Sequence, residues 1–383
     1  MLSISKSEEN EMREVKTYLH QHPETSMEEF ETTRFLREKL TAMGIELLDL
    51  GMKTGVVGIL RTDKKGPVVG LRADIDAIRC QELAEVKDKS LTEGLMHACG
   101  HDFHMTALLG AAKILTIEAC GDVVFIFQPA EETTSGAAEL IAHGLFDQVK
   151  LDYMFGLHNR PEILTGKVAV KRGSLMAAKD NFAITVQGVG GHGGMPHLTI
   201  DPIVCSAGII NAVQTILSRN IDPLDSAVVS ICSIHAGTPE NLIVDHLVMT
   251  GSIRTLSKKA RETVKERLAV IVENSAITYG CKAEIIYEGG VPLLDNSERM
   301  YQIALEAATE AMGVNAVVTT EPCLGSEDFA VYSEYVPTFF YWLGTGKDEG
   351  SAPWHNSRFT TDDDALVFGA KLLAQSVLTA QKK

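Results

Sequence analysis

The residues best suited to chemistry lie in one short stretch, Met96-His97-Ala98-Cys99-Gly100-His101-Asp102-Phe103-His104. Cys99 and His101 are two positions apart, and the glycine between them permits a tight turn that directs both side chains at one point. A thiol and an imidazole arranged in this way are good ligands for a borderline transition metal. A redox-active or buried cysteine beside incidental histidines is the alternative, so further ligands must come from elsewhere in the chain.

Three more metal-competent side chains, Glu132, His158 and His355, each lie in or next to a loop that follows an apolar run. Parallel strands joined by helices place such loops along one edge of a sheet, so we expect these side chains to converge. A single isolated histidine of this kind is more often structural than a ligand. Together with Cys99 and His101 the set has five donors, which exceeds the needs of one tetrahedral zinc and predicts two divalent ions that share a bridging thiolate or carboxylate.

The adjacent residues Glu131 and Glu132 are suited to two different roles in a metal site. Adjacent side chains do not usually bind one ion from the same direction, so one carboxylate can hold metal while its neighbour moves a proton. A solvated acidic pair at the start of a helix, where the helix dipole favours negative charge, is the alternative. Asp74, Asp76 and Asp102 are candidates to orient the ligand imidazoles, and structural hydrogen bonding is an equal alternative for each.

Composition limits the classes of protein that the chain can be. With 383 residues it exceeds the usual size of a single core, so two domains are expected. The formal net charge of −16 and the lack of a Lys/Arg stripe argue against nucleic-acid binding. Seven scattered cysteines without a secreted-scaffold spacing indicate a reducing compartment. No signal-peptide core and no apolar run of ~20 residues occurs, so we expect a cytoplasmic protein without membrane contact.

Two segments, 1–178 and 290–383, predict an α/β catalytic domain with a mostly parallel sheet. The run Val123–Phe127 is too short and too β-branched for a helix, and the run Pro67–Ala73 brings Asp74 to the end of a strand. The stretch around Cys99 is expected on the loop before a helix. The other predicted strands are Gly55–Arg61, Tyr153–Leu157 and Thr338–Leu343; the predicted helices are one from Ser7 to His22, Met27–Leu40, Thr106–Ala119, Ser135–Phe146, Ser297–Met312 and one from Asp362.

Between these segments, residues 179–289 show a different order of elements. They predict an inserted ferredoxin-like α+β domain with the order β-α-β-β-α-β. Its expected elements are Asn181–Gly188, the helix Asp201–Arg219, Ala227–His235, Leu242–Thr255, the helix Lys258–Tyr279 and Lys282–Tyr287.

Several motifs resemble a known family. The chain is similar over essentially its whole length to the metal-dependent amidohydrolases that include hippurate hydrolases, N-acyl-amino-acid amidohydrolases, plant auxin-conjugate hydrolases and N-acetyldiaminopimelate deacetylases. The stretch around Cys99, together with the Glu pair, is very specific for this family. The motifs are Leu71-Arg72-Ala73-Asp74-Ile75-Asp76-Ala77, His97–His104, Phe127–Glu132, Gly156-Leu157-His158-Asn159, Gly190-Gly191-His192, Gly251–Thr255 and Gly325–Phe329.

The resemblance implies a dimetal-peptidase-like catalytic domain, and an inserted domain that serves as lid and dimerisation domain of a homodimer or higher homo-oligomer. It implies two ions, manganese or zinc with cobalt or nickel as alternatives, held by Cys99, His101, Glu132, His158 and His355. Glu131 would be the general base and acid. His192, in this family typically from the inserted domain of the partner subunit, would stabilise the oxyanion, and Asn241 and Arg254 would bind the substrate carboxylate.

Two departures from the family pattern affect the details. Asn356 stands where a second histidine is frequent, and the segment Gln81–Leu95 is short and charged, which puts local substrate contacts in doubt. Broad aminoacylase or hippurate-hydrolase activity on a small N-acyl amino acid is the favoured function. A dedicated N-acetyl-L-diaminopimelate deacetylase is an alternative, suggested by the segment Gln214–Ser226. A catalytically inactive metal-binding regulatory protein is a third, but the intact Glu131 argues against it.

Overall fold

The computed structural model describes residues 2–237, 239–347 and 351–383, and the chain divides into two compact units. The first unit comprises residues 1–173, 295–321 and 328–383. The second comprises residues 174–294 together with the short segment 322–327. None of the helices in these described ranges combines the length and the apolar character that a bilayer crossing requires.

The first unit is built on an eight-stranded sheet with the order β1-β2-β4-β3-β5-β16-β6-β15. Its centre, β4-β3-β5-β16, is parallel, and β1, β2 and the β16–β6 pairing are antiparallel. The predicted mostly parallel α/β sheet is therefore confirmed. The strands are β1 (Glu46–Leu48), β2 (Val56–Leu60), β3 (Val69–Asp74), β4 (Val123–Gln128), β5 (Tyr153–Leu164), β6 (Val168–Ala169), β15 (Val317–Val318) and β16 (Thr338–Gly346).

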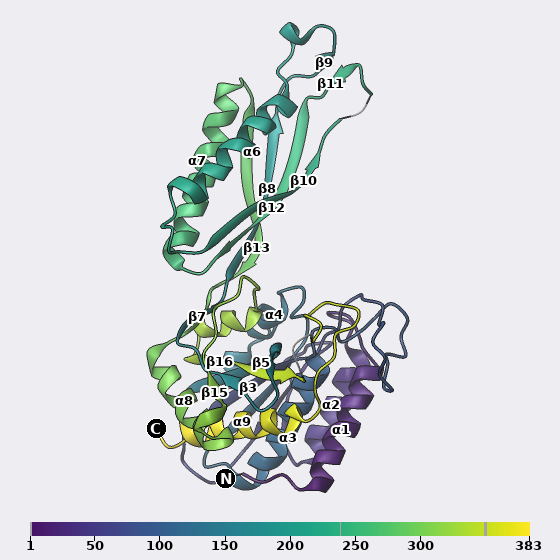
Figure 1. Cartoon of the computed structure of the whole chain (residues 1–383), viewed down its shortest axis with the longest axis vertical. Coiled ribbons are helices and arrows are strands. Elements are labelled where there is room, and N and C mark those ends of the chain that lie inside the picture. Colours follow the sequence, from purple (N-terminus) through teal and green to yellow (C-terminus); the bar gives the residue numbers. More distant parts are fainter. Residues whose placement is uncertain (1, 238, 348–350) are drawn as a thin grey trace. The chain divides into compact units, whose positions relative to one another are not determined.

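Helices cover this sheet and complete its core (Figure 1). Every residue of β3, β4 and β16 is buried, as expected for parallel strands that helices cover on both faces. The helices are α1 (Lys6–Gln21), α2 (Phe30–Ala42), α3 (His101–Glu118), α4 (Gly136–Ala142), α5 (Leu145–Gln148), α8 (Glu298–Met312) and α9 (Ala365–Ala380), with short 3₁₀ turns η2 (Val314–Ala316) and η3 (Asp328–Glu334).

The second unit contains a four-stranded antiparallel sheet with the order β10-β12-β8-β13, and α6 and α7 lie on one face of it (Figure 1). The chain order and the strand order are those of a ferredoxin-like unit, in agreement with the predicted fold class. The elements are β8 (Ala178–Gln187), β9 (Gly191–His192), η1 (Pro196–Leu198), α6 (Pro202–Arg219), β10 (Ala227–His235), β11 (Leu242–Ile243), β12 (His246–Thr255), α7 (Lys258–Thr278) and β13 (Lys282–Val291). Two short strands, β7 (Gly173–Met176) and β14 (Leu294–Asn296), include the residues at which the chain passes between the units.

Three predicted helix starts were wrong for identifiable reasons. Helix α1 is capped by Ser5, not Ser7, because only Ser5 has a glutamate three positions later to complete a capping box. Helix α2 begins at Phe30, since Met27 has φ +64° and cannot belong to a right-handed helix. Helix α3 was predicted to begin at Thr106, after the stretch around Cys99. It already begins at His101, directly after the left-handed Gly100 at φ +85°.

Three other predicted elements have different bounds. The predicted helix Ser135–Phe146 is divided into α4 and α5 by Gly144 at φ +85°. The predicted strand Leu242–Thr255 is divided into β11 and β12. The last helix begins at Ala365 rather than Asp362.

Candidate metal centre

The five predicted metal ligands lie in the first unit, near the carboxyl ends of its central strands. Cys99 and His101 follow β3 along the chain, Glu132 follows β4 and His355 follows β16. His158 departs from the prediction because it lies inside β5, which continues to Leu164. It lies beyond Gly156, the last β5 residue that pairs with β3.

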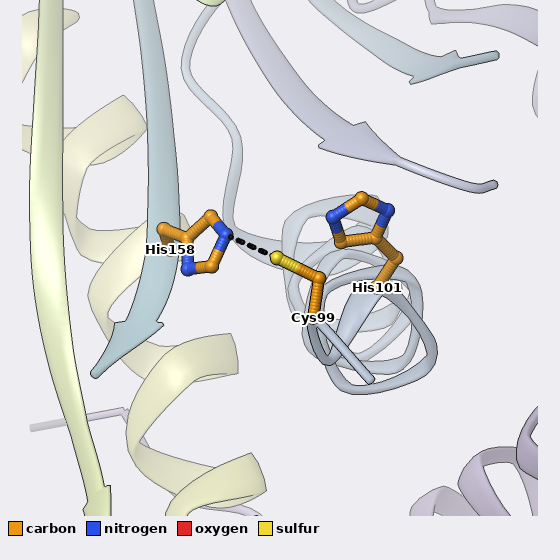
Figure 2. A group of neighbouring side chains, drawn as sticks. All are labelled: Cys99, His101 and His158. Carbon is orange, nitrogen blue, oxygen red and sulfur yellow. Dashed lines mark hydrogen bonds between the residues drawn. The ribbon is translucent and has the colours of Figure 1, made fainter. Parts of the chain in front are cut away.

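Cys99, His101 and His158 form one compact group, drawn in Figure 2. Their ligand atoms all lie within 4.8 Å of one another, and the Cys99 Sγ is 3.4 Å from His158 Nε2. Figure 2 shows the sulfur between the two imidazole rings. The left-handed Gly100 makes this possible, and a side chain at that position would collide with Asn159.

A second group contains Cys99, Glu132 and His355, again with ligand atoms within 4.8 Å. Glu132 Oε1 lies 3.3 Å from His355 Nε2 and 3.9 Å from His101 Nε2. His355 is brought here by its own N–H, which donates to the Ala98 carbonyl at 2.8 Å. Cys99 is therefore common to both groups, so its thiolate would be shared if each group held an ion.

Two atoms at the centre of the cluster are suited to bind a cation. Among the described residues, His101 Nε2 and Glu132 Oε1 are buried without a hydrogen-bond partner. Buried polar atoms are seldom left unpaired, and each such group calls for an explanation such as an ion. The donor set of thiol, imidazoles and carboxylate suits zinc or a similar divalent metal.

Hydrogen bonds on the far side of the two buried imidazoles fix their tautomers. His101 Nδ1 donates to the Asp76 carbonyl at 2.8 Å, with Asp76 Oδ1 at 3.2 Å, and His158 Nδ1 donates to the Asn159 carbonyl at 2.8 Å. Both Nε2 atoms are therefore free to face the centre, as in metal sites where an outer acceptor orients the ligand histidine. Of the two roles considered for Asp76, the structure shows the first, because Asp76 accepts from the candidate ligand His101.

The electrostatics of the cluster depend on its many carboxylates. Burial, reinforced by the charges of Glu132, Glu131 and Asp74, raises the pKa of the Cys99 thiol. Burial opposes protonation of His101, but Asp74 and Asp76 outweigh it and raise its pKa to about 10. Without a cation the cluster therefore retains protons that a metal ion would displace.

Glu131 is buried and lies beside these candidate ligands. One of its carboxylate oxygens forms a group within 4.8 Å with His101 and Glu132. The residue before it, Ala130, is fully buried and has φ +55°, which is uncommon for a residue other than glycine. This turn sends the two adjacent glutamates from the end of β4 into the cluster.

His104 is placed near the cluster but is held as a structural residue. Its Nδ1 donates to Asp74 Oδ1 at 2.6 Å, and its Nε2 accepts the backbone N–H of Asn159 at 2.9 Å. Neither nitrogen is then available to a metal, although Asp74, His101 and His104 have ligand atoms within 4.8 Å. Asp74 therefore orients a structural histidine rather than a ligand.

Two buried residues that support the site were not singled out from the sequence. Arg72 is fully buried and donates to Asp74 at 2.7 Å and to Asp328 at 3.0 Å. Asn159 donates to the Cys99 carbonyl and its Nδ2 lies 2.9 Å from His104 Nε2. A charged residue inside the apolar strand β3 was the available signal for Arg72, because a buried arginine requires partners.

Asp102 does not orient a ligand, contrary to one of the two roles considered for it. It accepts instead from His20 Nδ1 of α1 at 2.8 Å, while His20 Nε2 lies 3.3 Å from Glu82. Burial lowers the pKa of His20, but Asp102 and Glu82 outweigh it and raise this pKa to about 9.

This pair predicts a pH-dependent contribution to stability. Because the folded-state pKa of His20 lies above the unfolded value of ~6.5, its contribution is fully present below pH ~6.5 and is lost as the pH rises through the folded value of about 9. We expect His20→Gln to lower the free energy of unfolding at pH 6 by up to about 3 kcal/mol and to have a much smaller effect at pH 10. Chemical denaturation of both proteins across this range measures the difference, and an effect that grows with pH would contradict it.

Comparisons with known proteins identify the family of the chain. A model described as Peptidase family M20/M25/M40 matches residues 70–379. The chain belongs to this family. The predicted resemblance to metal-dependent amidohydrolases is thereby confirmed.

Individual relatives of the M20/M25/M40 family cover nearly the whole chain. An N-acetylcysteine deacetylase of Bacillus subtilis (strain 168) is 42% identical over 361 residues, which are 93% of this chain and 93% of that protein. A hippurate hydrolase of Campylobacter jejuni is 36% identical and covers 97% of this chain and 96% of its own. The solved structure of Bacillus subtilis YXEP, described as a dinuclear metal binding peptidase from the M20 family, has a TM-score of 0.86 and 36% identity, and the match covers 99% of each chain.

The three other predicted site residues lie in the second unit. His192 is exposed on β9, which pairs with β11, and its Nδ1 accepts the N–H of Gly194 at 3.0 Å. Asn241 is close to it, because its carbonyl accepts the N–H of Gly193 at 2.8 Å. Arg254 is half-buried on β12 and donates to Ser326 Oγ at 3.0 Å.

Proposed function

We propose that the protein hydrolyses the amide bond of N-acyl-L-amino acids with the help of two divalent metal ions. The observation that carries this proposal is the shared Cys99 thiol, which belongs to two groups of candidate ligands, with the Glu131 carboxyl beside them. His101 and His158 would complete one group, and Glu132 and His355 the other. The family to which the chain belongs, and the metal that YXEP is described as binding, support this assignment.

The ions would supply Lewis-acid polarisation of the amide carbonyl and of water. The mixture of thiol, imidazole and carboxylate ligands suits zinc or manganese, and cobalt or nickel are the alternatives. The two imidazoles have the outer hydrogen bonds that orient a metal-bound histidine, because their Nδ1 atoms donate to carbonyl groups, and a metal would replace the Nε2 proton of His101.

Glu131 is proposed as the general base and acid. It takes the proton of the attacking water and later delivers it to the departing amine, which leaves a carboxylate and a free amino acid. Its burial beside the ligands, while Glu132 contacts His355, supports the division of roles between the two glutamates. General acid–base transfer of this kind contributes on the order of 10²–10⁴ in rate.

Three residues of the second unit are proposed to act on the substrate. His192 would donate to the developing oxyanion, which is worth about 10²–10³ in rate per donor. Asn241 and Arg254 would bind the α-carboxylate, for which the guanidinium of Arg254 is chemically suited. We propose further that the protein is a homodimer in which His192 of the partner subunit completes each site.

A substrate panel tests the proposed function. We expect chelator-sensitive hydrolysis of N-acetyl-L-methionine, N-acetyl-L-cysteine and N-benzoylglycine, measured by release of the free amino acid. N-acetyl-L-cysteine is included because a relative is named as its deacetylase. Methyl esters of the same compounds should be cleaved much more slowly, since they lack the charge that Arg254 would bind.

With N-acetyl-L-diaminopimelate added, the panel also separates the alternatives. Rapid cleavage of N-acetyl-L-diaminopimelate alone would favour the dedicated deacetylase. If protein with its full metal content cleaves none of these compounds, the catalytically inactive metal-binding regulatory protein is the remaining alternative. Equal rates for acids and esters would remove Arg254 from carboxylate recognition.

The action of His192 across a dimer predicts complementation between two inactive variants. A heterodimer of His192→Ala and Glu131→Gln subunits has one site in which both residues are intact. Mixing the two variants under conditions of subunit exchange should restore about a quarter of the wild-type activity, given random pairing into two-fold symmetric dimers. Activity that stays at the level of the separate variants would show that His192 does not act in trans.

A further inference from the structure

The buried carboxylate of Glu29 contacts the turn that carries the Glu131-Glu132 doublet. Glu29 is more than one hundred residues away from this doublet in sequence. Glu29 Oε1 accepts the backbone N–H of Ala130 at 2.9 Å, and both residues are fully buried. Burial raises the pKa of Glu29 to about 7. A carboxylate placed in such surroundings is costly unless its hydrogen bonds repay the loss of water.

Glu29 stands at the start of α2, but its side chain does not cap that helix. Glu29 occupies the N-cap of α2, yet its side chain caps no N–H of that helix. Glu24 takes over this function, because its carboxylate oxygens accept the N–H groups of Glu31 at 3.1 Å and Thr32 at 2.8 Å. The carboxylate of Glu29 is thus left to reach across to β4 and the turn after it.

The turn that Glu29 contacts is strained and closely fixed. Ala130 has φ +55°, a left-handed conformation that is unfavourable for a residue other than glycine and persists only where the surroundings enforce it. The Ala130 carbonyl accepts the N–H groups of Ser135 and Gly136, each at 3.2 Å. Its N–H has the Glu29 carboxylate as partner, so the peptide groups before and after Ala130 are both held by hydrogen bonds.

The next residues are fixed by a different group. The N–H of Glu132 donates to Asp76 Oδ2 at 3.0 Å, and Asp76 in turn accepts from Ser26 Oγ at 2.7 Å. Asp76 therefore holds the peptide between Glu131 and Glu132, whereas Glu29 holds the peptide between Pro129 and Ala130. The two carboxylates thus hold the backbone on both sides of Glu131.

We propose that Glu29 is a positioning residue for Glu131: through the N–H of Ala130 it maintains the left-handed turn that directs the Glu131 carboxyl into the metal centre. This inference rests on the proposed function, in which Glu131 moves the proton. For this role Glu29 must place a hydrogen-bond acceptor at the N–H of Ala130. The negative charge of Glu29 is less important for the position of Glu131.

Two conservative variants separate reach from charge. Glu29→Gln retains an oxygen at the same distance but has no charge, and Glu29→Asp retains the charge but is one methylene too short. We expect kcat of Glu29→Gln to stay within about threefold of wild type, and kcat of Glu29→Asp to fall about 10- to 100-fold, since a displacement of ~1 Å at a catalytic group costs up to about 10² in rate. KM and the metal content should change little, because Asp76 still holds Glu132.

A matched control distinguishes positioning from a general effect on α2. Glu24→Ala removes the carboxylate that caps the same helix but does not contact Ala130. It should lower the melting temperature and leave kcat unchanged. A fall in kcat equal to that of Glu29→Asp would overturn the proposal, as would the reverse order of the Gln and Asp variants or a parallel loss of metal.

Ala130 provides a second test, in which the effect of the Glu29 substitution is compared between two backgrounds. Glycine adopts positive φ without strain, so Ala130→Gly should reduce the need for Glu29. The fold-loss in kcat caused by Glu29→Asp should then be at least threefold smaller in the Ala130→Gly background. Equal losses in both backgrounds would show that Glu29 does not act through this turn.

The two levels of inference fail in distinguishable ways. If Glu131→Gln keeps its turnover, the proposed function fails at its proton-transfer step. If Glu131→Gln is inactive and Glu29→Asp is fully active, the role of Glu131 stands and only the positioning role of Glu29 is lost.

Discussion

Replacing Glu131 by Gln should leave the metal content of the protein intact and reduce kcat by at least 10³-fold. The amide has nearly the shape of the carboxylate but cannot accept the proton of the attacking water, so the loss falls on the chemical step. A carboxylate oxygen of Glu131 lies within 4.8 Å of ligand atoms of His101 and Glu132, a separation that one water molecule can span. Metal analysis by mass spectrometry together with steady-state kinetics provides the measurement.

The neighbouring glutamate serves as the matched control. Glu132→Gln changes the same functional group one residue later, in a side chain that lies 3.3 Å from His355 Nε2. This variant should lose metal along with activity, whereas Glu131→Gln should lose activity alone. If the two variants lost metal equally, the division of roles within the doublet would be wrong.

Removal of the metal should abolish activity and should do so more easily at low pH. Binding of a cation must displace the protons of the Cys99 thiol and of His101, whose pKa values are raised by burial and carboxylates, respectively. Affinity for the metal should therefore rise with pH, by up to about tenfold per pH unit for each proton released. Calorimetric titration of the apoprotein with zinc or manganese in buffers of different ionisation enthalpy measures both the affinity and the number of protons.

The cysteines of the second unit provide the control for this experiment. Cys205 is as deeply buried as Cys99 but lies on α6, outside the candidate ligand groups found among the described residues. Cys205→Ala should bind metal as the wild type does, whereas Cys99→Ala should lose the shared ligand and with it both ions. Activity that persists after exhaustive chelation, or metal binding that releases no protons, would contradict the proposed centre.

Much of the site could be predicted from the residue types and their spacing. The tight turn at Gly100 and the convergence of Cys99 and His101 with His158 follow from local chemistry and from the parallel order of strands. The continuous apolar runs fixed β3 and β4, because a buried parallel strand needs no alternation. These features depend on residues close together in sequence and on a general rule of sheet topology, so they can be predicted without knowledge of the tertiary structure.

Other features required the folded chain. Apolar periodicity placed the start of α3 too late because His101, Asp102 and His104 read as polar loop residues, whereas in the structure each finds a buried partner from another element. The supporting roles of Arg72 and Asn159 could not be predicted for the same reason, because they depend on contacts with residues distant in sequence.

The sequence by itself determined the ligand types, the parallel α/β sheet and the ferredoxin-like insertion, because these follow from side-chain chemistry and from periodicity along the chain. Only the tertiary structure decided which polar residues act on the site and which merely support the fold. It separated Asp76, which orients His101, from Asp102, which contacts His20, and it brought Glu29 to Ala130. The physical reason is that a buried hydrogen bond depends on a few ångströms between distant segments, and that distance is set only when the core packs.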